Sequence, residues 1–441
     1  MSDALSRAAA VADDNPELAI QLCMQYLRDN PESAPGFTLG GVLHARAGVE
    51  AVALAFFERA VKLAPRCETW NNYGSQCHTL KLTQQARQAF ERALAMTDDP
   101  RKRAVYMCNM AATYTDDEQY ARALEWTTKA EKLDPACANL SQVARFPYLA
   151  IGDWRNGWRH WRSTIGTKHR KWLDFGGAEW NGEPTGTLVI YGEQGIGDEI
   201  AYASCIEDCR PLAERVIIEC DPRLEALYAR SFPWATVYGT RRGDRDWLDG
   251  TRVDAQVPVG NLPAYFRPEP ASCPKTPYLV PDPERVLMWR ALFASWGKPV
   301  VGLCWSGGRF ESQQQLRRVG LEAFRDYMGR RDAVYVSLQY TDPREEIAET
   351  GLPVRFFSEC LSEANYDETA AIVAALDDMV GIHTSAHHVR GAMGLPSTVL
   401  VPSPPMWQYA HGDGMPWYAG QVYHRQRKHE RWIDCVNRLR V

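Results

Sequence analysis

The N-terminal third of the chain carries a pattern that repeats three times, and this repeat constrains the fold more than any other feature. A small residue returns as Ala60, Ala93 and Ala130, with spacings of 33 and 37 residues. The surrounding positions are Phe37, Gly40, Gly41, His44, Ala53, Phe57 and Pro65 in the first set, Trp70, Tyr73, Gly74, Cys77, Ala86 and Phe90 in the second, and Met107, Met110, Ala111, Tyr114, Ala123, Thr127 and Pro135 in the third. Small residues let two antiparallel helices approach closely, and the large side chain fills the space between them.

This order of small and large positions is typical of the tetratricopeptide repeat (TPR). It predicts an all-α superhelix over residues 1–165, with a groove that can hold a protein partner. A degenerate fourth unit is expected at about 138–165. There Trp154, Trp158 and Trp161 follow helical spacing, and we expect them to be core residues that close the superhelix onto the next domain.

Composition limits the function classes that need to be considered. The 441 residues have room for about three domains, and a net charge of −5 favours neither nucleic acid nor an anionic membrane as a partner. No stretch is long and apolar enough for a membrane span, and the first residues lack the apolar core of a signal peptide. We therefore expect a cytoplasmic protein whose twelve scattered cysteines are buried reduced thiols.

From about residue 186 the periodicity changes to short apolar β-rich runs that alternate with helical stretches. Strands are expected at 187–191, 215–220, 235–238 and 253–257, and, after a proline-rich segment at 258–283, at 299–305, 333–338, 353–357, 379–383 and 397–402. The basic cluster near 424–431 is expected to start a helix. The pattern predicts two Rossmann-like α/β domains, 166–285 and 286–441, with a ligand cleft at the carboxyl ends of their strands.

A glycine loop follows the first of these strands, in the segment TLVIYGEQGIGDEI. Gly192, Gly195 and Gly197 permit close backbone approach, and Asp198 falls in the first turn of the next helix, beside its exposed N–H groups. The same glycines also suit ordinary packing. From the residues alone, the structural and functional interpretations of the loop carry equal weight.

The second α/β domain carries two comparable turns. The segment VGLCWSGG ends a strand at Ser306 and leads to Arg317, and a later strand ends in His383, Thr384 and Ser385 before a helix of small residues. Free N–H groups at that helix start suit a diphosphate. Ordinary helix capping explains the same residues, and both interpretations stay open.

Taken together, these segments resemble a known family. The chain resembles bacterial TPR proteins with a C-terminal glycosyltransferase related to lipopolysaccharide heptosyltransferases (glycosyltransferase family 9-like). The resemblance rests on the order of its segments: the repeat, LAIGDWRNGWRHWRS, the glycine loop, VGLCWSGG, LRRVGL, HTSAHHVRGAMGLP, MPWYAG and VYHRQ. The resemblance implies a GT-B architecture. Its first domain would bind a protein or glycan acceptor, its second a nucleotide-sugar donor, and transfer would need no metal or cofactor.

The resemblance also implies roles for single residues. Asp198 matches the general base of an inverting transfer, while Arg317 and Thr384 match the positions that face the donor diphosphate. Ser306, Ser385 and His388 fall in the same donor segments, and Trp417 and Tyr418 of MPWYAG are expected to pack rather than stack on a base.

One position departs from the family. Relatives usually carry Asp-Thr in the donor turn, whereas this chain has His383-Thr384. The chain is therefore expected to be either a nucleotide-sugar-dependent glycosyltransferase or a catalytically inactive GT-B-like scaffold that acts through its repeats. A nucleotide-sugar epimerase shares the architecture but does not account for the attached repeats.

Two groups of side chains resemble metal ligands. His383, His387 and His388 lie within six residues, but no carboxylate or cysteine accompanies them at a familiar spacing. Asp244 and Asp246 form an acid-x-acid pattern inside a charged turn, where a solvated loop is the better interpretation. We expect no metal site.

Overall fold

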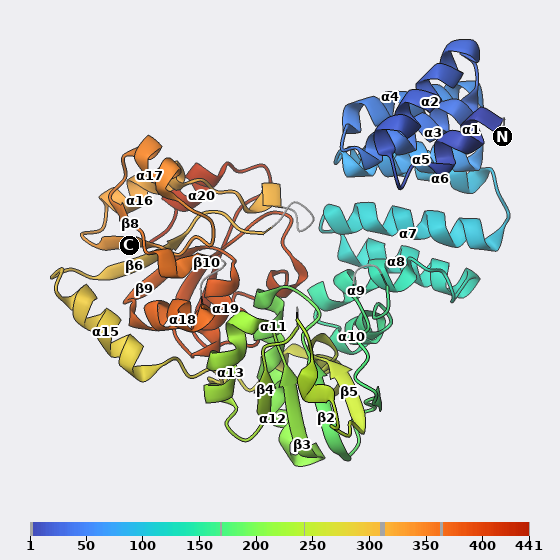
Figure 1. Ribbon diagram of the computed structural model, residues 1–441. Coiled ribbons are helices and arrows are strands. Elements are labelled where there is room, and N and C mark those ends of the chain that lie inside the picture. The colour runs from blue at the N-terminus through green and yellow to red at the C-terminus, as the bar shows by residue number, and fades with distance from the viewer. Residues whose placement is uncertain (1–2, 168–169, 242, 309–313, 362–364, 441) are drawn as a thin grey trace. The chain divides into compact units, whose positions relative to one another are not determined.

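The computed structural model describes residues 3–167, 170–241, 243–308, 314–361 and 365–440 (Figure 1). The chain separates into two compact units, Met1–Tyr148 and Leu149–Val441. Within the described ranges, no helix has both the length and the apolar character needed to cross a membrane. The expected domain limits at 165/166 and 285/286 stay predictions.

The first unit is a series of helix pairs, shown in blue to cyan in Figure 1. Its helices are α1 (Asp3–Ala10), α2 (Pro16–Asp29), α3 (Ala34–Arg46), α4 (Glu50–Leu63), α5 (Cys67–Thr79), α6 (Thr83–Ala95), α7 (Pro100–Asp116) and α8 (Tyr120–Leu133), followed by α9 (Leu140–Ala150). Contacts are densest between α3 and α4, between α5 and α6, and between α7 and α8. This pairing confirms the predicted TPR-like helical region.

The repeat positions explain why these helices pair. Ala60, Ala93 and Ala130 are each at most 1% exposed. A methyl group added at Gly41 or at Gly74 would lie 2.7 Å from an aromatic carbon of the following helix. The small residues therefore leave the space that the aromatic side chains fill, as the spacing predicted.

The second unit contains two parallel sheets. The first has the order β1-β5-β2-β3-β4, with strands β1 (Ala178–Glu179), β2 (Thr185–Tyr191), β3 (Ala213–Glu219), β4 (Thr236–Tyr238) and β5 (Ala255–Pro258). Its helices are α11 (Ile196–Tyr202), α12 (Ile206–Cys209), α13 (Glu225–Ser231) and α14 (Pro263–Phe266). The helix expected over 198–210 is divided, because a 3-10 turn at Ala203–Cys205 separates α11 from α12.

The second sheet has the order β11-β10-β9-β6-β7-β8. Its strands are β6 (Val300–Cys304), β7 (Val334–Ser337), β8 (Val354–Arg355), β9 (Asp378–Ile382), β10 (Ser397–Val401) and β11 (Gln421–Arg425). Its helices are α15 (Pro283–Ala294), α16 (Arg325–Gly329), α17 (Arg344–Thr350), α18 (Tyr366–Ala375), α19 (Ser385–Ala392) and α20 (Trp432–Asn437). The two parallel sheets confirm the Rossmann-like fold class.

The basic cluster near 424–431, which is expected to start a helix, does so only at its end, where Arg431 is the N-cap of α20 (Trp432–Asn437). Residues 421–425 form the edge strand β11, which pairs with β10 along its whole length, and the helix α20 begins only at Trp432. Basic side chains suit this place because charges on an edge strand discourage pairing with another chain.

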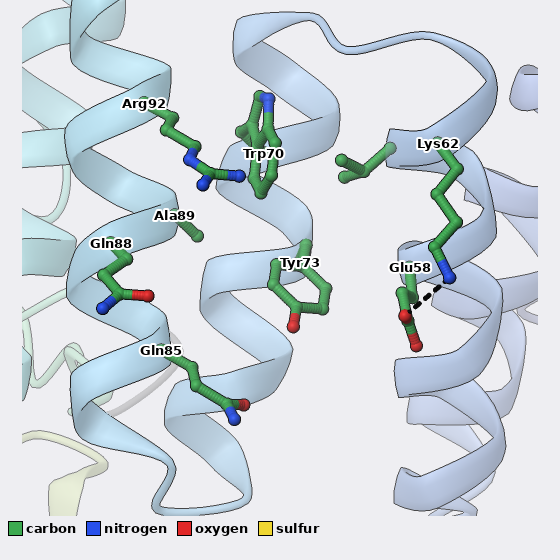
Figure 2. Close-up of a pocket in the computed structure, with 9 residues that line it drawn as sticks. Glu58, Lys62, Trp70, Tyr73, Gln85, Gln88, Ala89 and Arg92 are labelled. Carbon is green, nitrogen blue, oxygen red and sulfur yellow. Dashed lines mark ion pairs between the residues drawn. The ribbon is translucent and has the colours of Figure 1, made fainter.

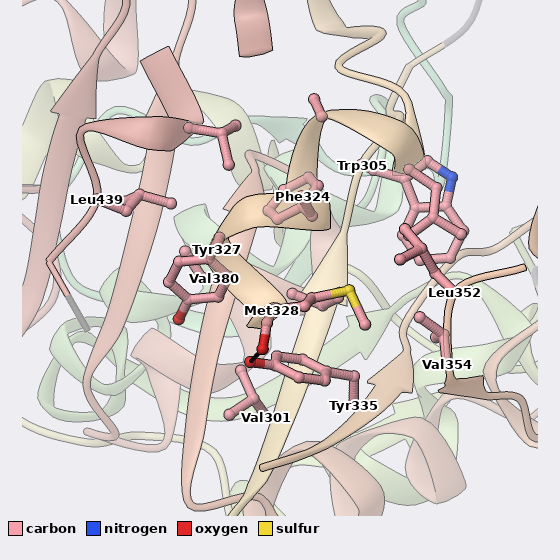
Figure 3. Packing of buried hydrophobic residues seen from close by; sticks show 14 of the residues in the cluster. Val301, Trp305, Phe324, Tyr327, Met328, Tyr335, Leu352, Val354, Val380 and Leu439 are labelled. Atoms are coloured by element: carbon pink, nitrogen blue, oxygen red, sulfur yellow. Dashed lines mark hydrogen bonds between the residues drawn. The ribbon is translucent and has the colours of Figure 1, made fainter. Parts of the chain in front are cut away.

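A continuous apolar core lies on one face of the second sheet. Val301 and Val380 of neighbouring strands contact Phe324, Tyr327 and other buried side chains that cover the sheet (Figure 3). Each of these four named residues is at most 2% exposed. This core anchors β6 and β9, the two strands whose carboxyl ends carry the predicted donor residues.

The helix α10 (Trp154–Arg162) belongs to the second unit and carries the three tryptophans. Trp158 lies 6.4 Å between ring centroids from Tyr202 of the first α/β half, and 5.3 Å from Trp407 of the second half. Trp154 packs on Trp417 at 4.9 Å. The tryptophans are core residues, as expected, and they join the two α/β halves. Trp417 also packs as predicted.

The cysteines also behave as expected. Each of the twelve is buried and free of a disulfide bond. Burial raises the pKa of Cys205 and of Cys304 to about 12, which keeps both thiols protonated.

Candidate functional site at the junction of the two sheets

The glycine loop after β2 lies against the start of α19, which follows β9. A methyl group added at Gly197 would lie 3.2 Å from His388 Cδ2 and 3.5 Å from Ser385 Cα. The helices α11 and α19 pack on each other at this point. Residues that are about 190 positions apart in sequence therefore meet where the carboxyl ends of both sheets converge, which is where parallel α/β sheets bind ligands.

A buried ion pair holds the first part of the glycine loop, at Glu193, in place. Arg170 Nη2 lies 2.6 Å from Glu193 Oε1, and the two side chains are only 2% and 0% exposed. Arg170 also donates hydrogen bonds to Asn261 Oδ1 at 2.8 Å and to the carbonyl oxygen of Trp161 at 2.8 Å. One guanidinium therefore ties the loop to α10 and to the segment after β5.

A second ion pair holds the end of the loop, at Glu199 in the first turn of α11. Arg241 Nη1 lies 2.6 Å from Glu199 Oε2, and Glu199 Oε1 accepts a hydrogen bond from the Asp221 N–H at 3.1 Å. The Glu199 carboxylate occupies the space that a side chain at position 192 would need. This close approach explains why residue 192 is a glycine. Burial raises the pKa of Glu199 to about 7, although Arg241 opposes the shift.

This shift predicts a pH dependence of stability. The folded pKa of Glu199 lies above the unfolded value of about 4.5, so the folded state binds the proton more tightly. That contribution is complete below pH 4.5 and is lost as the pH rises through 7. Relative to a Glu199→Gln variant, the natural protein is expected to lose on the order of 3 kcal/mol of unfolding free energy across this range. Denaturant unfolding of both proteins at pH 5 and pH 8 measures the difference, and parallel pH profiles would contradict the assignment.

In the sequence, Asp198 lies between the buried acids Glu193 and Glu199. Its side chain faces the α/β half that contains the second sheet. It is half-buried, and its Oδ1 accepts a hydrogen bond from Gln408 Nε2 at 3.2 Å. Gln408 belongs to a 3-10 turn at Trp407–Tyr409, after β10. The predicted acid is thus oriented by a residue from the other α/β half that sequence reasoning did not identify.

Arg317 is a buried cation at the junction. Its side chain fills the space that a Cβ at Gly308 would occupy, and Gly308 has a positive φ of 81°. Burial lowers the pKa of Arg317, while Tyr409, Tyr340 and Asp198 oppose the shift. The neighbouring Arg318 is exposed. Of the two adjacent arginines, only Arg317 therefore points into the junction.

Ser306 is held by a residue that the sequence did not reveal. The N–H groups of Trp305 and Ser306 donate to Gln339 Oε1 at 3.1 and 3.3 Å, and Gln339 Nε2 donates to Ser306 Oγ. Gln339 is 2% exposed and follows β7. The turn after β6 is therefore fixed from the neighbouring strand.

Thr384 directly precedes α19, but its side chain does not cap the helix. Its Oγ1 donates to Cys304 Sγ at 3.4 Å, and within the described residues no side-chain hydrogen bond caps the helix. Thr384 thus occupies the expected N-cap position, but its hydroxyl turns toward β6 and makes no capping hydrogen bond to a described N–H group. The N–H groups of Ser385 and Ala386 belong to the first turn of α19, at the positive end of the helix dipole, where backbone N–H groups have no intrahelical acceptor.

The three nearby histidines have three different sets of partners. His383 Nε2 lies 3.2 Å from Met406 Sδ, His387 Nδ1 lies 3.1 Å from Ser397 Oγ, and His388 lies 3.1 and 3.2 Å from the hydroxyl groups of Tyr418 and Tyr409. Burial lowers the pKa of His388 to about 4, so the ring is neutral at pH 7. A neutral imidazole has one donor and one acceptor nitrogen, so one tyrosine accepts a hydrogen bond and the other donates.

His383 is the residue at which the sequence departs from the family that it resembles, and it is 4% exposed. Its ring centroid lies 4.5 Å from that of Tyr409. Burial, with help from Arg317, holds the pKa of His383 well below its usual 6.5. A neutral aromatic side chain therefore stands at the position where the sequence resemblance implies a carboxylate.

Neither suspected metal group is assembled as a ligand cluster. Among the residues that the structure describes, no group of three or more His, Cys, Asp or Glu side chains is placed to hold a metal ion. Asp244 and Asp246 are exposed, and Arg245 between them pairs with Glu219 at 3.0 Å. Metal-independent chemistry stays a prediction.

Comparison with known proteins gives one relative along most of the chain. No family model matches the sequence. The protein FlbA of Caulobacter vibrioides is 25% identical over an aligned length of 438 residues, and the match covers 93% of this chain and 67% of FlbA. This match indicates distant homology that includes both the helical repeats and the α/β unit.

Solved structures match the chain only in part. A MamA fragment from Desulfovibrio magneticus RS-1 is 20% identical and covers 37% of this chain and 94% of its own, with a TM-score of 0.32. PilF of Pseudomonas aeruginosa is 16% identical and covers 39% of this chain and 77% of its own, with a TM-score of 0.34.

Proposed function

We propose that the second unit is a nucleotide-sugar-dependent glycosyltransferase of the GT-B type that acts on a protein or glycan acceptor. The observation that carries the proposal is the contact of Gly197 with Ser385 and His388. It brings the half-buried acid Asp198, the buried cation Arg317 and an uncapped helix start to one junction. An acid and an anion-binding surface on facing domains are the two parts that such a transfer requires.

In the proposed reaction, the diphosphate of the donor lies between Arg317 and the N–H groups at the start of α19. Both stabilise the negative charge that develops on the leaving nucleoside diphosphate as its bond to the sugar breaks. Asp198 takes the proton of the acceptor hydroxyl as its oxygen attacks the sugar carbon from the opposite face. The Gln408 amide keeps the carboxylate pointed at that face.

The donor site predicts unequal effects at two adjacent arginines. Arg317→Ala is expected to weaken binding of a nucleoside diphosphate by about 1.5–3 kcal/mol, because a charge-assisted hydrogen bond is lost. Arg318→Ala is the matched control, since Arg318 is exposed, and it should leave the affinity nearly unchanged. Isothermal titration calorimetry against a panel of nucleoside diphosphates measures both. Equal affinities in folded natural protein and Arg317→Ala would remove Arg317 from the site.

A second candidate function is a catalytically inactive scaffold that binds a sugar or a protein. The observation in its favour is His383, which is buried and neutral. It offers no carboxylate to accept hydrogen bonds from a donor sugar. In that case the helical repeats carry the function, and the junction retains at most ligand binding. Sugar transfer by the purified protein separates the two candidates.

A further inference from the structure

The first unit contains a groove that the proposed transferase chemistry does not use. It has a volume of about 500 Å³ and lies between α4 and α6, with α5 as its floor (Figure 2). The lining residues are Glu58, Val61, Lys62, Trp70, Tyr73, Gln85, Gln88, Ala89 and Arg92. A cavity of this size accommodates a few side chains of a bound segment.

The floor of the groove is aromatic. Trp70 and Tyr73, three residues apart on α5, are both half-buried, and their ring centroids lie 6.0 Å apart in an edge-to-face arrangement. The Trp70 Nε1–H is buried and has no hydrogen-bond partner within the described residues. An indole N–H at the base of a groove can donate to a carbonyl oxygen of a bound chain.

The two walls differ in charge. On α4, Glu58 and Lys62 neutralise each other at 2.8 Å. On α6, the Arg92 guanidinium lies 4.4 Å from the centroid of the Trp70 ring. Arg92 is exposed, and in the described part of the chain its side chain makes no hydrogen bond or ion pair. The groove therefore offers a ligand one positive charge, that of the planar Arg92 guanidinium. Stacking on the Trp70 ring holds this guanidinium in place.

Amide side chains complete the α6 wall. Gln85 and Gln88 line the groove beside Arg92 (Figure 2). Each amide can both donate and accept hydrogen bonds, which suits the backbone of an extended segment better than the surface of a packed domain.

We propose that this groove binds an extended acidic peptide segment of a partner protein. An apolar side chain of the peptide covers Trp70 and Tyr73, and a neighbouring carboxylate forms a bidentate pair with Arg92. The amides and the Trp70 N–H bind the peptide backbone. This inference is independent of sugar transfer, because all the residues that carry it lie on α4, α5 and α6.

The test uses the full chain and a display library of random ten-residue peptides. Enriched sequences are synthesised, labelled and titrated by fluorescence anisotropy against the natural protein and the Arg92→Gln and Trp70→Phe variants. Arg92→Gln removes the charge but keeps much of the side chain, and Trp70→Phe keeps an aromatic ring but removes the N–H donor. The matched control is Lys129→Gln on α8, since Lys129 lies 4.6 Å over the Trp126 ring outside the groove.

We expect the enriched peptides to share an acidic residue next to an apolar one. Arg92→Gln should weaken their binding about five- to tenfold and Trp70→Phe by a similar factor, with little effect from Lys129→Gln. Affinity should also fall when salt is raised, because an exposed charge pair is screened. Enriched peptides without an acidic residue, equal binding to Arg92→Gln, or no peptide whose binding depends on Trp70 would each overturn the proposal. Circular dichroism confirms that each variant is folded.

Discussion

Replacing Asp198 by asparagine is expected to lower sugar-transfer turnover by about 10²–10⁴-fold while leaving donor affinity unchanged. Asparagine cannot take up the proton of the acceptor hydroxyl. Its Oδ1 can still accept the hydrogen bond from Gln408, so the loop keeps its shape. Turnover, nucleotide affinity and melting temperature are measured on the same purified variant.

The competing role for Asp198 is that of an acid in the first turn of α11. That role predicts a stability loss of about 0.3–1 kcal/mol with turnover largely intact. Glu207→Gln is the control, because Glu207 is an exposed acid in the following helix α12. If the natural protein transfers no sugar from any donor that it demonstrably binds, the scaffold function is the correct one, and His383 is the first residue to test.

Replacing Arg170 by methionine is expected to lower the free energy of unfolding of the second unit by about 3–5 kcal/mol. The change leaves the Glu193 carboxylate charged and buried, with its side chain 0% exposed. It also removes donors to Asn261 and to the carbonyl oxygen of Trp161. Denaturant unfolding followed by tryptophan fluorescence measures the loss.

An exposed ion pair supplies the control for this prediction. Arg252→Gln breaks a pair with Asp254 in which the arginine side chain is 89% exposed, and it should cost less than about 1 kcal/mol. A loss below about 1 kcal/mol for Arg170→Met as well would show that the buried pair does not hold the glycine loop in place.

Much of the fold is predictable because it depends on local patterns. The small and large positions around Ala93 follow from the approach of two neighbouring helices, and apolar runs such as 187–191 mark buried parallel strands. The edge strand β11 escaped prediction because its burial pattern is mixed, and only pairing with β10 makes it a strand. The two-residue strand β1 likewise depends on pairing with β5.

Some residues of the candidate site could likewise be predicted from local sequence patterns, whereas others could not. Glycines and an acid at the end of a strand leave a local signal, so the loop with Asp198 was visible in the sequence. Gln408 binds Asp198 across 210 positions, and Gln339 reaches Ser306 from a neighbouring strand. A single glutamine among apolar neighbours has no pattern of its own, so these partners emerge only from the fold.

The central claim, that the junction of α11 and α19 is a nucleotide-sugar site, is tested most directly by a crystal structure of the protein with a nucleoside diphosphate sugar selected by calorimetry. We predict the diphosphate between the Arg317 guanidinium and the N–H groups of Ser385 and Ala386, with the reacting sugar carbon facing Asp198. A donor bound away from this junction, or the absence of binding by every nucleotide sugar in the panel, would contradict the claim.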